Sequence, residues 1–479
     1  MINPIENQTT EENVAFIARD KGLLHQEHLR LFEFPQIFST SSIWLEKGME
    51  KHIATYDVVI RDLPKNRNFL LLGGVEEIIS QLVDWRYTEE EITYLLNLRI
   101  ITEKFADYLR NFRFTGDVHA LPEGTVFFPG EPIIRITAPI IEGNLLSLFI
   151  INAVSGNTAF LSKFIRPMLI SQGKKITGPG GIRAQSFESG MKACRAAHIC
   201  GLSQVLPSFY RKYKLIQQPP IIIAYHAYIK SFPTELEAMR EIVKTFPTVS
   251  FMVDTYDINT GVDNAIKVAL ELKEEGKSLA GIVIDSGDLF QSAVMARQKL
   301  DRAGLSNVKI VVASNLDEFK IEDLIKRKIP ADGFVIATEA ITLSDDPKIE
   351  TVYKISEIHH HGKTQQVAKL TPGKESLPGK KQVFRSYTSE GKIQKDIIGL
   401  ESENLGKKLL IPYIEKGVLT RELPHLDEIK KHVVTQIESL PNHLKELRAS
   451  YENMVETSKE INQIMQELRE THLNKGEFK

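Results

Sequence analysis

Residues 280–288 read AGIVIDSGD, a short apolar run that ends in two carboxylates around a Ser-Gly turn. Other segments repeat this plan of an apolar strand with a polar end: residues 221–229 (IIIAYHAYI), 250–257 (SFMVDTYD), 308–315 (VKIVVASN) and 333–338 (GFVIAT). Amphipathic helical runs lie between them, at residues 234–245, 261–275, 289–303 and 316–327. Apolar strands that alternate with helices predict an α/β protein with a parallel sheet buried on both faces.

Polar residues stand where the predicted strands end. They are Asp254, Asp257, Asp285, Ser286, Asp288, Ser314, Asn315 and Thr338. Carboxyl ends of parallel strands meet at one edge of a sheet, where α/β proteins collect their active sites. The repetition of polar ends over consecutive strands therefore predicts a functional site there.

The turn at residues 284–289 carries the sharpest chemical signal. Asp285 and Asp288 could hold Mg²⁺ and stabilise positive charge on a sugar carbon. Gly287 allows a close backbone approach to a ligand, and Ser286 with the following amides could bind phosphate or ribose oxygens. In the alternative interpretation, both aspartates only cap the next helix.

His226 lies within an apolar segment that we predict to be a strand. Its position near the other strand ends favours a general acid/base or phospho-acceptor role, whereas a lone histidine of this kind is more often a core residue. Residues 177–183 (TGPGGIR) match neither a P-loop nor a dinucleotide fingerprint. They form either an anion-binding loop or a plain loop, and Arg183 and Arg195 are the candidate cations for phosphate contact.

Composition excludes several classes of protein. Of the 479 residues, 42% are hydrophobic and 25% charged, and the formal charge of −2 predicts no nucleic-acid surface. The two cysteines make neither a zinc motif nor a disulfide framework. The start of the chain lacks the features of a signal peptide, and no uncharged apolar run reaches the roughly 18–20 residues of a membrane span. We therefore expect a cytoplasmic protein.

Sequence motifs along much of the chain resemble those of the nicotinate phosphoribosyltransferase family. The resemblance covers residues 34–385 and extends more loosely through the tail. Its carriers include residues 61–67 (RDLPKNR), 114–118 (FTGDV), 162–163 (SK), 195–197 (RAA), 254–257 (DTYD), 284–289 (IDSGDL) and 313–318 (ASNLDE).

The resemblance implies a type II phosphoribosyltransferase with an irregular α/β barrel. Residues 1–140 would form an N-terminal α/β domain completed by part of 355–420, residues 141–354 the barrel, and residues 420–479 a helical C-terminal extension. Apolar residues from Leu444 to Leu468 recur at helical spacing, as either a partner-binding seam or one helix packed on its own domain.

The family reaction joins nicotinate to phosphoribosyl pyrophosphate, with Mg²⁺ and coupled ATP hydrolysis, usually in a homodimer. The resemblance implies that His226 is the histidine that becomes phosphorylated and that Thr338 contacts the sugar-phosphate donor. Asp254, Ser286, Gly287 and Asn315 would also line the substrate site, and Asp285 and Asp288 would form its acidic end. Phe38 stands where the family has a tyrosine that stacks on the pyridine ring.

Some residues of the family's nicotinate pocket are replaced. Val283 stands in place of an arginine, which removes a charge-assisted hydrogen bond worth about 1.5–3 kcal/mol. Ile223 replaces a threonine, and residues 335–338 (VIAT) replace a glycine-containing phosphate turn. The sequence thus predicts a nicotinate phosphoribosyltransferase, or a relative with another acceptor base. The alternative is an inactive descendant that binds a nucleotide or a protein.

Overall fold

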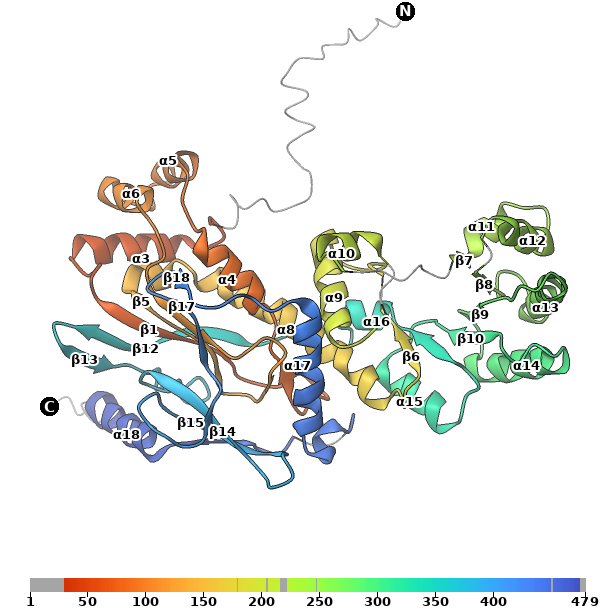
Figure 1. The fold of residues 1–479 in the computed structure, drawn as a ribbon. Coiled ribbons are helices and arrows are strands. Elements are labelled where there is room, and N and C mark those ends of the chain that lie inside the picture. The colour runs from red at the N-terminus through yellow and green to blue at the C-terminus, as the bar shows by residue number, and fades with distance from the viewer. Residues whose placement is uncertain are drawn as a thin grey trace, which may run out of the picture.

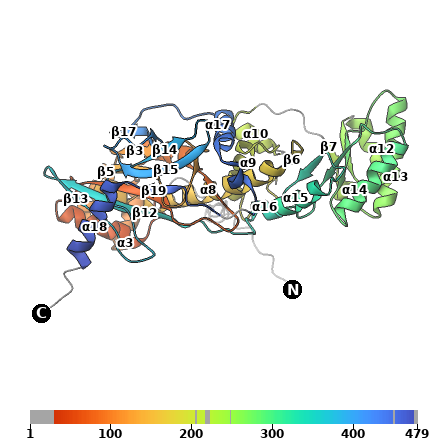
Figure 2. The same cartoon turned by 90° about the horizontal axis from the view of Figure 1, so that it is seen from below.

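The computed structural model describes residues 30–178, 180–203, 206–215, 222–246, 248–448 and 451–473. Two α/β units lie at opposite ends of an elongated molecule (Figures 1 and 2). Each unit has its own hydrophobic core. The mixture of a parallel sheet covered by helices and a second, largely antiparallel sheet confirms the predicted α/β class.

Helix α8 (Ser147–Ile170) joins the two units. Its first half packs in the N-terminal core and its second half in the core of the parallel sheet. In the described part of the chain, only α8 is long and apolar enough to cross a membrane, and 72% of its most apolar window is buried inside the protein. A core helix passes the same test, and the burial of α8 identifies it as one.

Six parallel strands form a half-barrel in the second unit. Their order is β6-β11-β10-β9-β8-β7, which does not close into a ring among the described strands. All the predicted strands are present, and β6 is an addition that the sequence pattern did not reveal. The strands are β6 (Lys175–Thr177), β7 (Ile222–Ala224), β8 (Val249–Met252), β9 (Gly281–Ile284), β10 (Lys309–Val312) and β11 (Gly333–Val335).

Helices follow each of the last five strands and cover the sheet from outside (Figure 1). They are α11 (His226–Lys230), α12 (Glu235–Thr245), α13 (Ile258–Glu274), α14 (Leu289–Arg302), α15 (Glu318–Lys326) and α16 (Thr338–Ile341). Helix α9 (Phe187–Ile199) packs against α8, and α10 (Pro207–Lys212) follows it. Gly261 in α13 lies so close to Val253 that a Cβ there would be 2.0 Å from the Val253 carbonyl oxygen.

The structure corrects the predicted strand at residues 221–229. Strand β7 ends at Ala224, and His226 is the first residue of α11. His226 therefore stands beyond the carboxyl end of its strand and is half-buried, rather than inside an apolar strand.

A seven-stranded sheet forms the N-terminal unit, with the order β13-β12-β1-β5-β3-β17-β18. Its neighbours pair antiparallel, and β12 and β17 come from distant parts of the chain. The strands are β1 (Ile53–Ile60), β3 (Asp117–Ala120), β5 (Pro132–Pro139), β12 (Thr351–His360), β13 (Lys363–Gln366), β17 (Ile411–Glu415) and β18 (Val418–Leu419). Strands β2 (Leu70–Leu71) and β4 (Val126–Phe127) make a separate pair, and the helices of this unit are α3 (Pro35–Glu46), α4 (Val75–Val83), α5 (Glu89–Asn97), α6 (Glu103–Arg110) and α7 (Ile140–Asn144).

The C-terminal part of the chain is not continuously helical. A third sheet, in the order β16-β14-β15-β19, joins it to the preceding residues. Its strands are β14 (Lys381–Tyr387), β15 (Ile393–Leu400), β16 (Lys407–Lys408) and β19 (Val455–Thr457), and its helices are α17 (Leu426–Ser439) and α18 (Lys459–Leu473).

The predicted helical seam from Leu444 to Leu468 is wrong. A short 3-10 helix (Asn442–Lys445) and β19 interrupt it, because the backbone around β19 pairs with β15. The N–H of Asp396 donates to the Met454 carbonyl at 2.8 Å, and that of Ser458 donates to the Ile398 carbonyl at 2.9 Å. Sheet pairing with a distant strand thus overrides the local helical pattern.

A buried charge cluster connects the third sheet to strand β4. Arg385 donates to both carboxylate oxygens of Asp396, at 2.8 and 2.6 Å, and to the Val126 carbonyl at 2.8 Å. Glu131 is also buried, and its pKa is raised well above its ordinary value by burial and then by Asp396. Burial and the neighbouring Asp396 therefore both favour the protonated form of Glu131.

Replacing Glu131 with glutamine is expected to stabilise the protein increasingly as the pH rises. Because the folded pKa of Glu131 is raised, its contribution to stability is complete below the unfolded pKa of about 4.3 and is lost as the pH rises through the folded pKa. The neutral amide has no such loss. Urea unfolding of both proteins between pH 4.5 and 8 checks this, and a difference in stability that stays constant would contradict it.

Candidate active site

Hydrogen bonds link the ends of consecutive strands. Asp254, after β8, accepts at Oδ2 from the backbone N–H of Asp285 at 3.0 Å and from Ser286 Oγ at 2.6 Å. Asp285, after β9, accepts from the backbone N–H of Ser314, which follows β10. The structure thus brings together Asp254, Asp285 and Ser286, as the sequence predicted for side chains at one sheet edge.

His226 belongs to the same edge. Its Nδ1 lies 3.0 Å from Thr255 Oγ1, in the residue next to Asp254. Burial and then Asp254 raise the pKa of Asp285, and His226 opposes this rise. The net pKa of Asp285 is therefore raised. A histidine held by a hydroxyl beside two carboxylates can exchange protons or accept a phosphoryl group.

The second carboxylate oxygen of Asp254 takes no part in these hydrogen bonds. Among the described residues, Asp254 Oδ1 is buried and has no hydrogen-bond partner. Burial, opposed by a hydrogen bond from Asn264, also raises the pKa of nearby Glu235, and Asp254 contributes to this rise. Partly buried carboxylates gathered in this way favour a cationic ligand, because unpaired charge away from water is costly.

Mg²⁺ in proteins is held by one or two carboxylates together with substrate phosphates and water. The described residues contain no group of three or more His, Cys, Asp and Glu side chains that could hold a metal. Asp254 and Asp285 nevertheless fit Mg²⁺, since the ion would satisfy Asp254 Oδ1 and reduce the repulsion between the two charges. These residues would hold the ion together with the phosphates of a substrate.

Asp288 has a different position from Asp285. Its Oδ1 accepts from the backbone N–H groups of Phe290 and Gln291, both at 3.0 Å, so it caps α14. Asp257 caps α13 in the same way. The capping interpretation therefore holds for Asp288 Oδ1. Gly287 lies between, at φ +74° with open space beside it, so the backbone is accessible to a ligand there.

The end of β10 is strained. Ser314 and Asn315 have φ of 78° and 44°, in the left-handed region that side chains disfavour at a cost of roughly 1–3 kcal/mol each. Such strain persists only where the surroundings enforce it. Thr338 begins α16 after β11, and its carbonyl accepts from the Thr342 hydroxyl at 2.7 Å. Ser314, Asn315 and Thr338 thus stand at the same sheet edge as Asp285.

Phe38 lies outside this group, whereas Arg183 lies in a loop that follows another strand of the same sheet. Phe38 is 1% exposed in the hydrophobic core of the N-terminal unit, so it offers no face for stacking on a ring. Phe38 lies on a helix face that packs inward, and its correspondence with a family tyrosine did not reveal this. Arg183 is exposed, at φ 73°, in the loop after β6. Arg195, another candidate cation, is buried and pairs with Glu123 and Glu76, each at 2.5 Å.

Two of the replaced pocket residues are buried. Ile336 is 1% exposed and belongs to the hydrophobic core, and Val283 is 6% exposed within β9. Ile223, by contrast, is 42% exposed. The apolar substitutions at Ile336 and Val283 are therefore accommodated inside the fold.

Sequence reasoning missed Thr255 and Glu235 as parts of the site. Thr255 holds His226, and Glu235 adds a buried carboxylate whose Oε2 accepts from Asn264 at 3.0 Å. Both residues stand in motifs that the family resemblance includes, so their motif membership was the available signal. Their hydrogen-bond partners, His226 and Asn264, are brought to them only by the tertiary fold.

Comparison with known proteins agrees with this architecture. The nicotinate phosphoribosyltransferase N-terminal domain matches residues 37–155, and the C-terminal domain of the same family matches residues 404–465. In the solved structures, human nicotinic acid phosphoribosyltransferase superposes with a TM-score of 0.80 at 21% identity, over 91% of this chain and 99% of that one. At that identity, the likeness shows the fold.

Curated relatives extend the match along the chain. A nicotinate phosphoribosyltransferase of Mycobacterium tuberculosis is 32% identical over 417 residues, which cover 86% of this chain and 87% of the relative. The Bacillus subtilis enzyme of the same name is 29% identical over 457 residues, covering 89% and 92%. With these matches over most of its length, the chain belongs to the nicotinate phosphoribosyltransferase family of phosphoribosyl-transferring enzymes.

Proposed function

We propose that this protein transfers the phosphoribosyl group of phosphoribosyl pyrophosphate to nicotinate, in salvage of NAD. The observation that carries this proposal is the linked set of Asp254, Asp285 and Ser286 at the strand ends, with His226 beside it. Relatives of nearly the same length that bear the name of this activity support it.

The reaction breaks the bond between the sugar carbon C1 and the pyrophosphate oxygen, and pyrophosphate leaves with the electron pair. The ring nitrogen of nicotinate then bonds to C1, which gives nicotinate mononucleotide. Positive charge develops on the sugar while the first bond breaks. Asp285, fixed by the Ser314 N–H, supplies a negative charge toward which that carbon can be oriented.

We also propose that Mg²⁺ and ATP take part. Mg²⁺ would neutralise the pyrophosphate of the donor, with Asp254 and Asp285 as its protein ligands and Asp288 as a further candidate. His226 would accept a phosphoryl group from ATP, and its hydrogen bond to Thr255 supports a fixed ring orientation. We further propose a cytoplasmic homodimer.

Turnover of nicotinate tests the proposal directly. Purified protein is incubated with phosphoribosyl pyrophosphate, Mg²⁺ and either nicotinate or nicotinamide, with and without ATP, and nucleotides are separated by chromatography. We expect nicotinate mononucleotide and pyrophosphate in equal amounts, with more product when ATP is present. If only nicotinamide gave a mononucleotide, nicotinamide would be the acceptor in place of nicotinate. If the donor were not consumed with any pyridine base, the proposal would be overturned.

A further inference from the structure

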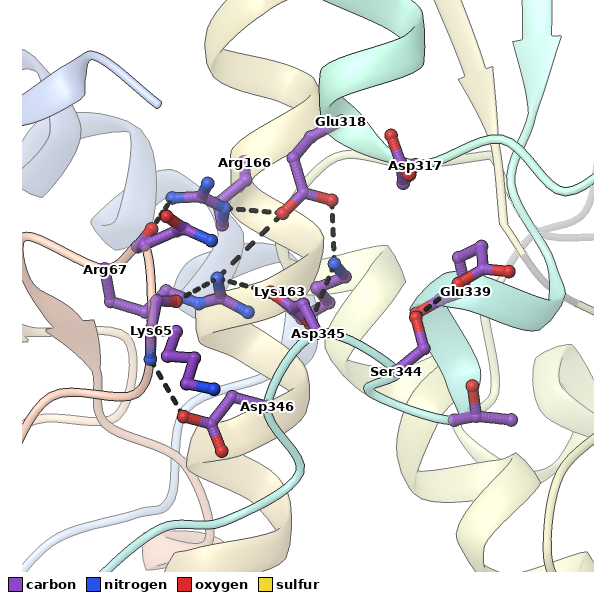
Figure 3. Close-up of polar contacts among 12 residues, drawn as sticks. Lys65, Arg67, Lys163, Arg166, Asp317, Glu318, Glu339, Ser344, Asp345 and Asp346 are labelled. Carbon is purple, nitrogen blue, oxygen red and sulfur yellow. Dashed lines mark hydrogen bonds and ion pairs between the residues drawn. The ribbon is translucent and has the colours of Figure 1, made fainter. Parts of the chain in front are cut away.

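Five buried or nearly buried charged side chains meet between α8 and the parallel sheet (Figure 3). At their centre, Lys163 Nζ lies 2.7 Å from Glu318 Oε2 and 3.0 Å from Asp345 Oδ1. Lys163 and Glu318 are 2% and 1% exposed. A single ammonium group therefore bridges two carboxylates inside the protein.

Two arginines complete this charge network. Arg166 Nε donates to Glu318 Oε1 at 2.7 Å, and Arg67 Nη1 donates to Asp345 Oδ2 at 2.8 Å. Burial alone would raise the pKa of Asp345, yet Arg67 and Lys163 hold it at about 2. Both carboxylates are therefore ionised, and neither can leave its partners without a buried charge becoming unpaired.

The two carboxylates come from loops that leave neighbouring strands. Glu318 is the first residue of α15, close after the strained Ser314 and Asn315 that follow β10. Asp345 follows α16, whose first residue is Thr338 at the end of β11. Lys320 Nζ also donates to the Asn315 carbonyl at 2.7 Å, so α15 holds Asn315 directly.

We propose that Lys163 is a positioning residue, which holds the loops after β10 and β11 in mutual register so that Asn315 and Thr338 can bind the sugar-phosphate donor together. Lys163 itself lies on α8, whose other end is embedded in the N-terminal core. Arg67 of the N-terminal unit donates to the carboxylate of Asp345, so the site is connected to that unit as well. The catalytic part of this inference rests on the proposed function.

Hydrogen exchange tests the positioning without any activity. The amides of residues 313–318 and 338–346 are followed by mass spectrometry in wild type, Lys163→Met and Arg385→Met. Arg385 is an equally buried cation in the third sheet, so its variant controls for general destabilisation. We expect both loops to exchange faster in Lys163→Met only. Wild-type rates in Lys163→Met, or the same increase in Arg385→Met, would overturn the inference.

Kinetics then test the consequence. In Lys163→Met we expect a higher KM for phosphoribosyl pyrophosphate, an unchanged KM for nicotinate and a fall of about tenfold to a hundredfold in kcat per folded molecule. Lys163→Arg should recover most of the loss. If Lys163→Met does not fold, Glu318→Gln, which keeps the side-chain shape, takes its place in both experiments. If the wild-type protein showed no turnover, the proposed function would be contradicted. The exchange result would still decide whether Lys163 positions the two loops.

Discussion

Asp285→Asn is expected to lower kcat for phosphoribosyl transfer by roughly 10²–10³-fold, equivalent to about 2.7–4 kcal/mol, the usual cost of removing one electrostatic stabiliser of a transition state. The amide has the shape of the carboxylate and can still accept from the Ser314 N–H, so the fold should be retained. In the proposed mechanism, the variant would lose the negative charge beside the sugar carbon and a ligand for Mg²⁺. Steady-state kinetics with saturating donor and nicotinate measure the change.

Asp257→Asn is the matched control for this variant. Asp257 also follows a strand of the same sheet, but its carboxylate accepts from the Thr260 N–H at 2.8 Å and caps α13. Asparagine caps a helix as well as aspartate does. We therefore expect its kcat to remain near that of wild type. A loss smaller than about tenfold in Asp285→Asn would remove Asp285 from the electrostatic role that we assign to it.

Arg385→Met is expected to destabilise the folded protein by about 3–5 kcal/mol, the usual cost of breaking a buried ion pair. Arg385 and Asp396 are both buried, and the variant leaves the Asp396 carboxylate without its cation. Hydrogen bonds from Arg385 to Val126 and Gln436 are lost too, so the third sheet loses its link to β4 and α17. Equilibrium unfolding in urea at pH 7 measures the difference.

Arg240→Met gives the comparison for an exposed pair. Arg240 lies 2.6 Å from Glu271, but the side chains are 48% and 44% exposed. Because solvent screens such exposed pairs, we expect this variant to change stability little. If Arg385→Met cost no more than Arg240→Met, burial would not be what makes the Arg385 pair important. Refolding yields should be checked first, since the two-state treatment requires reversible unfolding.

The parallel-sheet unit was largely predictable because its information is local. Residues 281–284 and 310–312 are continuous apolar runs, and such runs between amphipathic helices form buried parallel strands. Placement of Asp254, Asp285 and Asn315 at one edge follows from parallel pairing alone. His226 was predicted inside a strand but lies beyond its end, because Ile-rich runs do not show where a strand stops.

The roles of individual aspartates could not be separated by sequence. Asp285 and Asp288 flank the same turn, yet Asp285 faces Asp254 while Asp288 caps α14. The direction of each side chain depends on the backbone dihedrals of the turn, and both arrangements suit the same residues. For the same reason, Phe38 could be matched to a family position but not seen to lie in the core.

By itself, the sequence determined the α/β class, the polar residues that follow the parallel strands, and the family. Each of these depends on residue types at short spacing or on ordered motifs. Only the tertiary structure decided that Lys163 bridges Glu318 and Asp345, and that β19 interrupts the C-terminal helices. Those contacts join residues far apart in the chain. Their energy depends on which groups become buried together, and that is a property of the packed whole.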